Sequence, residues 1–260
     1  MIKMCSLYSG SSGNCIYVES GNTSLLVDCG VSGKKIENAL CEIGVDIKKI
    51  NAILLTHEHS DHICSAGIMH RKTGAAIYGN EATLELSKEF FGKIKDDGIE
   101  VFNGSFSVGD IYVTPFSIPH DASNPVGFTF SDGLKKVSVA TDIGHMTDEV
   151  MENLKGSNIV LLEANHDVDM LLSGPYPYEL KKRILSDIGH LSNENAGLTC
   201  ARLLESGTSD VILGHLSAQN NHPDLCYVTV RSVLEGKGYK PCDYNITVAS
   251  RVMPGDVHIC

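Results

Sequence analysis

Three histidines and one aspartate fall within six residues, at His57, His59, Asp61 and His62. They follow an apolar run at residues 53–55, which is typical of a buried strand. After a strand, His57 and His59 can project to one side, whereas Asp61 and His62 lie in a tightening turn and point elsewhere. The spacing therefore predicts two neighbouring metal centres, an arrangement typical of metal-dependent hydrolases.

Other interpretations of this cluster are weaker. A helical His-Glu-x-x-His zinc site needs its histidines one turn apart, but Asp61 stands four residues after His57. A solvated loop would have to place three histidines and two acids directly behind an apolar strand. Cys29 and Cys64 lie near the candidate ligands in sequence, but small buried residues near a site are common, so we expect them to be structural.

Three further candidate ligands follow apolar strands later in the chain, at His120, Asp142 and His215. A rigid scaffold commonly presents reactive side chains at the ends of strands. A lone Asp or His there is usually a cap or turn residue, but the cluster at residues 57–62 favours a shared site. The resulting nitrogen and oxygen ligands suit zinc, manganese or iron and do not choose among them.

The elements that must position these residues are strands and helices in two halves. In the first half we expect short antiparallel strands in residues 4–28, strands at 51–55 and 75–78, and helices at 32–43, from about 62, and at 80–90. Residues 99–140 are typical of hairpins. In the last third we expect strands at 159–163 and 210–213, helices at 178–185, 193–206 and 224–235, and a closing strand at 244–249. Two mixed sheets packed face to face with helices outside would bury both sets of strands, so the fold class is α/β.

Length and composition bound the class of protein. The 260 residues suffice for one large domain, and no linker-like stretch divides residues 1–260. Nine scattered cysteines without a C-x-x-C pair disfavour disulfides and fit a reducing cytoplasm. No apolar run approaches the roughly 20 residues of a membrane span, so we expect a soluble cytoplasmic protein. The net charge of −11 argues against a broad basic surface, so any phosphate substrate must be held locally.

The order of the candidate ligands resembles the metallo-β-lactamase superfamily. Asp28 precedes the histidine cluster, and His120, Asp142 and His215 follow it in order, so the resemblance spans nearly the whole chain. It implies an αββα sandwich that binds two divalent metal ions, zinc or manganese, with iron as a further possibility. It also implies that Asp28 orients the histidine loop by hydrogen bonding and does not bind metal.

The resemblance assigns the ligands to two sites that share one bridging carboxylate. The first site comprises His57, His59 and His120, the second comprises Asp61, His62 and His215, and Asp142 bridges the two metals. Lactamases proper place a cysteine among their second-site ligands, so Asp142 disfavours antibiotic hydrolysis. Flavodiiron proteins usually have Glu where His59 stands, which disfavours an oxygen or nitric oxide reductase. The stretch between Asp142 and His215 is too short for the cap domain of RNase J-like enzymes.

Two later segments resemble the phosphodiesterase branch of the superfamily. Residues 161–167 contain Glu163 and residues 187–196 contain His190, and both segments are similar to those of tRNase Z and cyclic phosphodiesterases. The resemblance implies that His190 serves the leaving group and that Glu163 orients it. Alternatively, His190 is simply a histidine outside the helix that Ser192 caps. His166 is a weaker candidate for substrate contact, and the alternative for it is an exposed loop histidine.

The resemblance extends to the WalJ/YycJ group of bacterial proteins, which are described as 5′ to 3′ DNA exonucleases. It rests on residues 9–14, 119–122 with 125–128, 189–193, and 214–217 with 220–221. It implies a nucleic acid substrate, DNA with a 5′ end. The candidate substrate contacts are Ser12, Asn14, His166 and Asn220. A Gly/Ser turn such as residues 9–14 is by itself usually only a hairpin, so the resemblance carries this expectation.

The predicted reaction is phosphodiester hydrolysis. Two metals roughly 3.5–4 Å apart would generate a bridging hydroxide that attacks phosphorus. Asp61 would bind metal and orient the water, and His190 would stabilise charge or donate a proton to the leaving oxygen. A glyoxalase II-type thioesterase or another small-molecule metallohydrolase would not need His190. A non-catalytic regulatory protein is the remaining alternative.

Several features stay without an assigned role. His145 and His222 are expected to be surface histidines. The run Lys181, Lys182 and Arg183 could offer phosphate contacts, but we expect a solvated helix face there. The sequence does not determine the physiological metal, the polarity of digestion or the oligomeric state.

Overall fold

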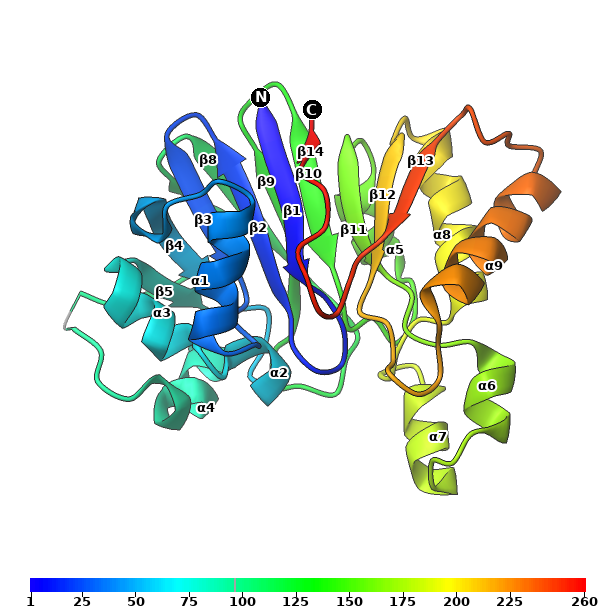
Figure 1. Cartoon of the computed structure of the whole chain (residues 1–260), viewed down its shortest axis with the longest axis horizontal. Helices are drawn as coiled ribbons and strands as arrows, with labels where there is room; N and C mark the ends of the chain where they lie inside the picture. The colour runs from blue at the N-terminus through cyan, green and yellow to red at the C-terminus, as the bar shows by residue number, and fades with distance from the viewer. Residues whose placement is uncertain (96) are drawn as a thin grey trace.

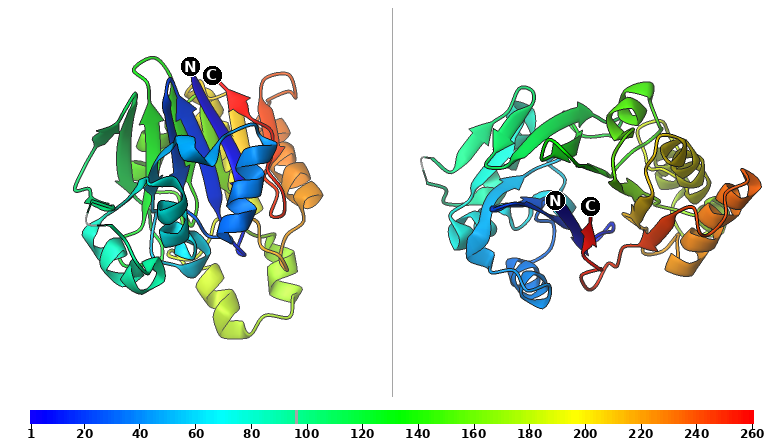
Figure 2. Two further views of the ribbon diagram at one scale, coloured as in Figure 1. Left: turned by 60° about the vertical axis from the view of Figure 1, so that its left-hand side comes forward. Right: turned by 90° about the horizontal axis from the view of Figure 1, so that it is seen from above.

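The computed structural model describes residues 1–95 and 97–260. Within that part, two seven-stranded sheets pack face to face and helices cover their outer faces (Figures 1 and 2). The first sheet has the order β14-β1-β2-β3-β4-β5-β6, and the second has the order β13-β12-β11-β10-β9-β8-β7. The expected α/β sandwich of two mixed sheets is confirmed.

The first half of the chain builds the first sheet. β1 (Ile2–Tyr8), β2 (Cys15–Ser20) and β3 (Thr23–Val27) pair antiparallel, and β4 (Ile50–Leu54), β5 (Ala76–Gly79) and β6 (Ile99–Val101) continue the sheet in parallel with β3. The connecting helices are α1 (Gly33–Glu42), the 3-10 helix η1 (Ile47–Lys49), α2 (Ser60–Ile63), α3 (Ala66–Thr73) and α4 (Glu81–Phe91). Because β3 and β4 are parallel, their carboxyl ends meet at the same edge.

The second half of the chain builds the second sheet, again with antiparallel strands first and parallel strands after them. β7 (Phe106–Val108), β8 (Ile111–Ser117), β9 (Val126–Ser131) and β10 (Lys136–Ala140) pair antiparallel, and β11 (Ile159–Glu163), β12 (Asp210–Gly214) and β13 (Asn245–Val248) run parallel with β10. The helices of this half are α5 (Asp148–Leu154), α6 (Val168–Ser173), α7 (Tyr178–Ile184), α8 (Asn193–Glu205) and α9 (Pro223–Gly236). The last strand, β14 (His258–Ile259), returns to the first sheet and pairs with β1.

The longer expected elements all occur, and the differences concern short ones. β6 pairs in parallel with β5, so the prediction that hairpins begin at residue 99 is wrong, and the hairpins begin at β7. The strand at β13 does not close the chain, because β14 follows it. α5 and α6 were not expected. These elements have two to seven residues, too few to show a period in the sequence.

Apolar side chains form three buried layers in this sandwich. One lies between the sheets and includes Phe128 and Leu161. A second packs the first sheet against α1, α3 and α4, and the third packs Leu162 and the outer face of the second sheet against α5, α8 and α9. Because neighbouring residues of a strand face opposite sides, β11 needs apolar residues on both faces and appears in the sequence as a continuous apolar run.

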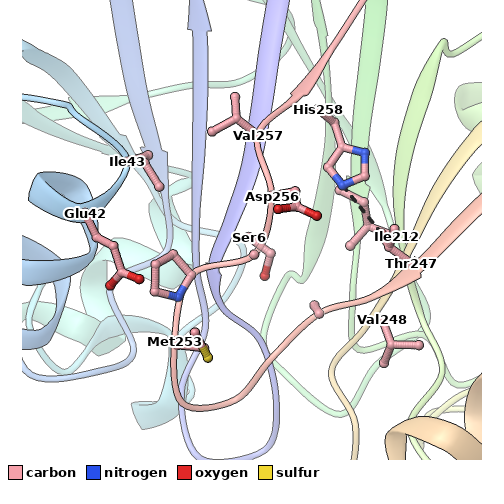
Figure 3. A pocket seen from close by; sticks show the side chains of 13 residues that line it. Ser6, Glu42, Ile43, Ile212, Thr247, Val248, Met253, Asp256, Val257 and His258 are labelled. Atoms are coloured by element: carbon pink, nitrogen blue, oxygen red, sulfur yellow. Dashed lines mark hydrogen bonds between the residues drawn. The ribbon is translucent and has the colours of Figure 1, made fainter.

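The segment after β13 begins beside the end of β12 that precedes His215, where the Ala249 N–H donates to the Leu213 carbonyl at 2.8 Å, and it reaches β14 beside Asp210 at the other end of β12. It borders a cavity of about 510 Å³, whose lining includes Ser6, Thr247 and Asp256 (Figure 3). His258 Nδ1 pairs with Asp210, the first residue of β12, at 2.9 Å, and its Nε2 lies 3.5 Å from Thr247 Oγ1. The contact joins β14 of the first sheet to β12 of the second.

Two expectations from composition bear on this structure. All nine cysteines are unpaired in the structure. Among the described residues, no helix combines the length and the apolar character that crossing a bilayer requires.

The layer between the sheets should dominate the stability of the fold. Phe128 is fully buried there, and Phe128→Ala should lower the free energy of unfolding by about 3–5 kcal/mol through lost burial and a residual cavity. Leu134 is 88% exposed, and Leu134→Ala should change it by less than about 0.5 kcal/mol. Urea denaturation of both variants measures the difference, and similar midpoints would contradict the assignment.

Candidate metal centre

The candidate residues gather where parallel strands of both sheets end. Asp28 follows β3 directly, Glu163 is the last residue of β11, and His215 follows β12 directly. His57 lies shortly after β4, and Asp142 lies two residues after β10. In open α/β sheets the loops beyond the carboxyl ends of the strands form the binding crevice. The two sheets therefore contribute to one site.

Three of these residues hold a strained backbone. Asp28, Asp142 and His215 have φ angles of 60°, 61° and 56°, and they are the only non-glycine residues with positive φ in the described part of the chain. The left-handed region is sparsely populated for such residues, and each instance costs on the order of 1–3 kcal/mol. Packing and hydrogen bonds around the site must offset this cost. Strain of this kind commonly gathers at functional sites.

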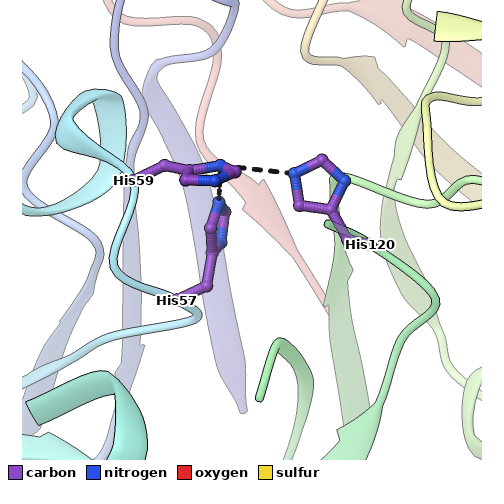
Figure 4. Close-up of side chains that lie close together, drawn as sticks. All are labelled: His57, His59 and His120. Carbon is purple, nitrogen blue, oxygen red and sulfur yellow. Dashed lines mark hydrogen bonds between the residues drawn. The ribbon is translucent and has the colours of Figure 1, made fainter. Parts of the chain in front are cut away.

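His57, His59 and His120 form a first cluster (Figure 4). His59 Nδ1 lies 3.0 Å from His57 Nε2 and 3.3 Å from His120 Nε2. The opposite ring nitrogens have partners of their own, since His57 Nδ1 lies 3.0 Å from Thr56 Oγ1 and His120 Nδ1 lies 3.2 Å from the Gly189 carbonyl. Those Nδ1 atoms donate, so the Nε2 atoms that face the cluster carry lone pairs.

Asp61, His62 and His215 form a second cluster beside the first. Asp61 Oδ2 lies 3.6 Å from His62 Nε2 and 3.7 Å from His215 Nε2. His62 Nδ1 lies 2.7 Å from Asp28 Oδ2, and His215 Nδ1 lies 2.9 Å from Glu163 Oε1. Because a buried carboxylate accepts from each Nδ1, both rings are held with Nε2 toward Asp61, where the deprotonated rings would offer lone pairs to a metal ion.

Asp142 lies between the two clusters. Its Oδ2 is 3.2 Å from His62 Nε2, and its Oδ1 is 3.7 Å from His120 Nε2. The side chain is almost fully buried. One carboxylate therefore reaches histidines of both clusters, which is the placement that a bridging ligand requires.

Asp28 fixes the histidine loop. Its Oδ1 accepts from the Thr56 backbone N–H at 2.9 Å, and its Oδ2 accepts from the Thr56 hydroxyl at 2.9 Å and from His62. The Thr56 hydroxyl donates to Asp28 and therefore accepts from His57 Nδ1. One buried carboxylate thus orients His62 directly and His57 through Thr56.

Glu163 has the corresponding place on the second sheet. Its Oε1 accepts from His190 Nδ1 at 2.8 Å and from His215 Nδ1 at 2.9 Å. Its Oε2 accepts from the backbone N–H of Ile143 at 2.6 Å and of Leu191 at 3.2 Å. Glu163 therefore ties His190 to the candidate ligand His215 and to the loop of Asp142. With Nδ1 donating to Glu163, the nitrogen of His190 that is available to a substrate is Nε2.

The donor set fits metal ions. The Nε2 lone pairs of His57 and His120 converge in the first cluster, where facing lone pairs repel one another. In residues 1–95 and 97–260, the buried Asp142 Oδ2 and His215 Nε2 have no well-formed hydrogen bond, and their neighbours are His62 Nε2 at 3.2 Å and Asp61 Oδ2 at 3.7 Å. An unsatisfied buried polar atom costs about 1–3 kcal/mol. Divalent cations would remove both the repulsion and this cost, and imidazole with carboxylate suits zinc, manganese or iron.

The carboxylates also set the protonation of the imidazoles. Burial disfavours the charged forms of His62 and His215, but Asp142 and the carboxylates hydrogen-bonded to them outweigh it. The pKa of His62 is raised well above its usual value, and the pKa of His215 is raised to about 10. Burial raises the pKa of Glu163, because it disfavours the carboxylate, but His190 and His215 outweigh this effect and lower the pKa to about 2. Glu163 is therefore an anion at neutral pH.

The four candidate substrate contacts lie at different depths. Ser12 is exposed on the loop after β1, whereas Asn14 is buried, with Nδ2 3.1 Å from His62 Nε2. His166 is 1% exposed, so the alternative of an exposed loop histidine is wrong, and burial lowers its pKa to about 4. Asn220 is buried, and its carbonyl accepts from the Asp167 N–H at 2.9 Å. Only Ser12 of these four lies on the surface.

The residues without an assigned role divide between the surface and the interior. His145 and His222 are exposed, as expected; His145 Nδ1 donates to the Asp187 carbonyl, and His222 accepts from the Asp224 N–H as the N-cap of α9. Cys29 is buried and Cys64 is exposed. Among the described residues, neither belongs to a group of converging ligand atoms.

Several contacts that build the site have no local signal in the sequence. The Ser9 hydroxyl accepts from the His215 N–H at 2.8 Å, across 206 residues of chain. A Cβ on Gly30 would lie 1.5 Å from the Asp61 carbonyl oxygen, so the loops meet too closely for a side chain. Asp121 Oδ1 lies 3.4 Å from His120 Nε2, and the other Asp121 oxygen pairs with Arg183 of α7.

Known proteins that are similar in sequence match most of this chain. The family model for the metallo-beta-lactamase superfamily matches residues 8–215. A Bacillus anthracis protein named exodeoxyribonuclease YycJ is 40% identical over 235 residues, which is 90% of this chain and 89% of the relative. A Streptococcus pneumoniae protein named exodeoxyribonuclease WalJ is 41% identical over 228 residues, 86% of this chain and 85% of the relative.

Solved structures with the same fold are more distant in sequence. The metallo-beta-lactamase fold protein YhfI from Bacillus subtilis superposes with a TM-score of 0.73 at 16% identity, covering 98% of this chain and 100% of that one. The short form of human tRNase Z superposes with a TM-score of 0.61 at 18% identity, covering 99% and 100%. These similarities confirm the fold.

Metal binding should release protons. A ligating imidazole must be neutral, whereas the raised pKa values of His62 and His215 keep both protonated at neutral pH before metal is added. Affinity should therefore increase between about pH 6 and pH 8, with roughly two protons released per chain. Calorimetric titration of the apo-protein in buffers of different ionisation enthalpy counts the protons. A metal affinity that is independent of pH would contradict this charge distribution.

The hydrogen bonds of Asp28 should increase the affinity for metal by one to two orders of magnitude. Asp28→Asn keeps the shape but replaces an acceptor with a donor, so His62 and Thr56 lose their orientation, and affinity should fall about 10–100-fold. Asp224 is 93% exposed, and Asp224→Asn is the matched control that should leave affinity unchanged. Competition with a chromophoric chelator measures both, and equal affinities of the two variants would contradict the role of Asp28.

Proposed function

The chain belongs to the metallo-β-lactamase superfamily, and we propose that it is a di-metal phosphodiesterase that acts as a 5′ to 3′ DNA exonuclease. Two relatives that share about two-fifths of their residues with it over most of both chains are named exodeoxyribonucleases. The single observation that supports cleavage of a phosphodiester bond is the position of His190. It is hydrogen-bonded to Glu163, its Nδ1 lies 3.8 Å from Asp142 Oδ1, and it stands beside the candidate ligands.

Seven residues would hold the metals. His57, His59 and His120 would bind one ion, Asp61, His62 and His215 would bind the other, and Asp142 would contact both. When bound, two divalent ions, zinc or manganese, would activate a water molecule and neutralise charge on a phosphodiester. Asp28 and Glu163 would not bind metal, because each already accepts hydrogen bonds from the histidines that it orients.

The protein's own residues would perform the remaining chemistry. Asp61, which is less buried than the histidines around it, would orient the attacking water from the solvent side. His190 would use Nε2 to donate a proton to the departing oxygen, while Nδ1 stays hydrogen-bonded to Glu163. The Glu163 carboxylate fixes the ring through Nδ1 and leaves Nε2 as the nitrogen that would meet the departing oxygen.

Residues 1–260 would act as one domain in this reaction. Asp28 and the cluster at residues 57–62 follow strands of the first sheet, whereas Glu163, His190 and His215 belong to the second. Because each sheet supplies only part of the centre, neither half could hold two metals alone.

Digestion of end-labelled DNA tests the proposed function. The manganese- or zinc-loaded protein is incubated with 5′-phosphorylated single strands and duplexes, with RNA, with bis(p-nitrophenyl) phosphate and with a glutathione thioester. We expect mononucleotides released from the 5′ end and hydrolysis of the small diester. Hydrolysis of the thioester alone would contradict the proposal and favour a glyoxalase II-type activity.

The role of His190 has its own test. His190→Ala should lower kcat by about 10²–10⁴, since a positioned acid contributes that much, and should leave bound metal unchanged. His145→Ala removes an exposed histidine and is the matched control. Steady-state kinetics together with elemental analysis separate the two effects. A parallel loss of metal and activity would show that His190 is a ligand instead.

A further inference from the structure

We propose that α7 (Tyr178–Ile184) binds the nucleic acid strand beside the metal centre, with Arg183 on a backbone phosphate and Tyr178 with Lys182 on an adjoining nucleotide. This inference rests on the proposed function and adds the surface that holds the polymer. α6 and α7 project from the sandwich below the lower ends of the sheets, on the side to which the loop carrying α2 extends (Figures 1 and 2). A strand that leaves the metal centre on this side would cross α7.

Charge makes a local binding element necessary. The chain carries a net charge of −11, and Asp28, Asp61, Asp142 and Glu163 gather at the centre itself. A polyanion gains most of its affinity from cations that contact its phosphates. The last turn of α7 contains three consecutive cations, Lys181, Lys182 and Arg183, whereas its first turn has one acid, Glu179.

Asp121 connects Arg183 to the first cluster, which comprises His57, His59 and His120. Arg183 Nε pairs with Asp121 Oδ2, and Asp121 Oδ1 lies 3.4 Å from His120 Nε2. That oxygen is buried and accepts no hydrogen bond from the described residues. Asp121 therefore holds the Arg183 guanidinium at the edge of the centre with its Oδ2 atom, while its Oδ1 atom faces His120. The Arg183 side chain is 52% exposed, so its remaining N–H groups can reach a phosphate in the bidentate geometry that Arg favours.

The backbone after α7 also anchors this helix to the centre. The His190 N–H donates to the Ile184 carbonyl at 3.0 Å, and the Gly189 carbonyl accepts from His120 Nδ1 at 3.2 Å. The end of α7 is therefore held relative to both the first cluster and the candidate acid. A phosphate on Arg183 would have a defined position relative to the bond that is cleaved.

Tyr178 and Lys182 supply the contacts farther from the centre. Tyr178 is 71% exposed, and the Lys182 ammonium lies 5.8 Å from the centre of its ring. The two residues are four apart and share one face of the helix. Exposed aromatic rings with nearby cations bind single-stranded nucleic acid by stacking on bases and contacting phosphates. Tyr178 and Arg183 are separated by roughly 8 Å along the helix axis and by roughly 140° around it, so a strand that contacts both must cross the helix and not run along one face.

Arg183→Ala and Tyr178→Ala test the proposal in the metal-loaded protein. Fluorescence anisotropy with a 5′-phosphorylated single-stranded oligonucleotide should show about 10–100-fold weaker binding for Arg183→Ala. Tyr178→Ala should weaken it about 5–100-fold. KM for the oligonucleotide should rise in parallel, while turnover of bis(p-nitrophenyl) phosphate and metal content stay at wild-type values. Arg183→Ala should also reduce the dependence of log affinity on log salt by about 0.7.

Matched controls and the contrary results complete the test. Lys88→Ala removes an exposed cation from α4, and Tyr112→Ala removes a ring that is 52% exposed on β8; both should bind the oligonucleotide as the wild type does. Wild-type cleavage of DNA with unchanged affinity in both α7 variants would overturn the inference while sparing the proposed function. Equal losses on the small diester would also overturn it, because Arg183 would then support the metal centre. A wild type that neither binds nor cleaves nucleic acid would overturn both.

Discussion

Two buried carboxylates, one from each sheet, determine the geometry of the candidate metal centre. Asp28 accepts the Nδ1 proton of His62, and Glu163 accepts those of His190 and His215. Each bond fixes a tautomer and turns the opposite ring nitrogen in a defined direction. Without these acceptors the imidazoles could rotate, and their Nε2 atoms would no longer converge. The arrangement of the candidate ligands thus depends on two residues that, on this proposal, would bind no metal.

The sandwich explains how the two carboxylates come to face the same space. β3 and β11 end at the same edge of two packed sheets, and the buried layer around Phe128 holds that edge together. The positive φ angles at Asp28, Asp142 and His215 direct their side chains into the site at an energetic cost. A rigid, well-packed sandwich can support such strain because the packing of its core offsets the cost.

Local patterns in the sequence were sufficient for most of the fold and for the candidate ligands that the structure brings together. Apolar runs that end in His or Asp located the strands before His57, Asp142 and His215, and the order of these residues identified the superfamily. Contacts between remote segments had no local signal. Ser9 meets His215 across 206 residues, and Asp121 meets Arg183 across 62. Thr56 is too common a residue to mark the hydrogen-bond relay, and two-residue β14 is too short to show a strand period.

The central claim is that both sheets together hold two metal ions that share Asp142. Crystals of the metal-loaded protein, measured with anomalous diffraction on both sides of the absorption edge of the metal, test it directly. The account predicts two peaks roughly 3.5–4 Å apart, with Asp142 in contact with both and His190 with neither. A single peak, or a peak coordinated by His190, would contradict it.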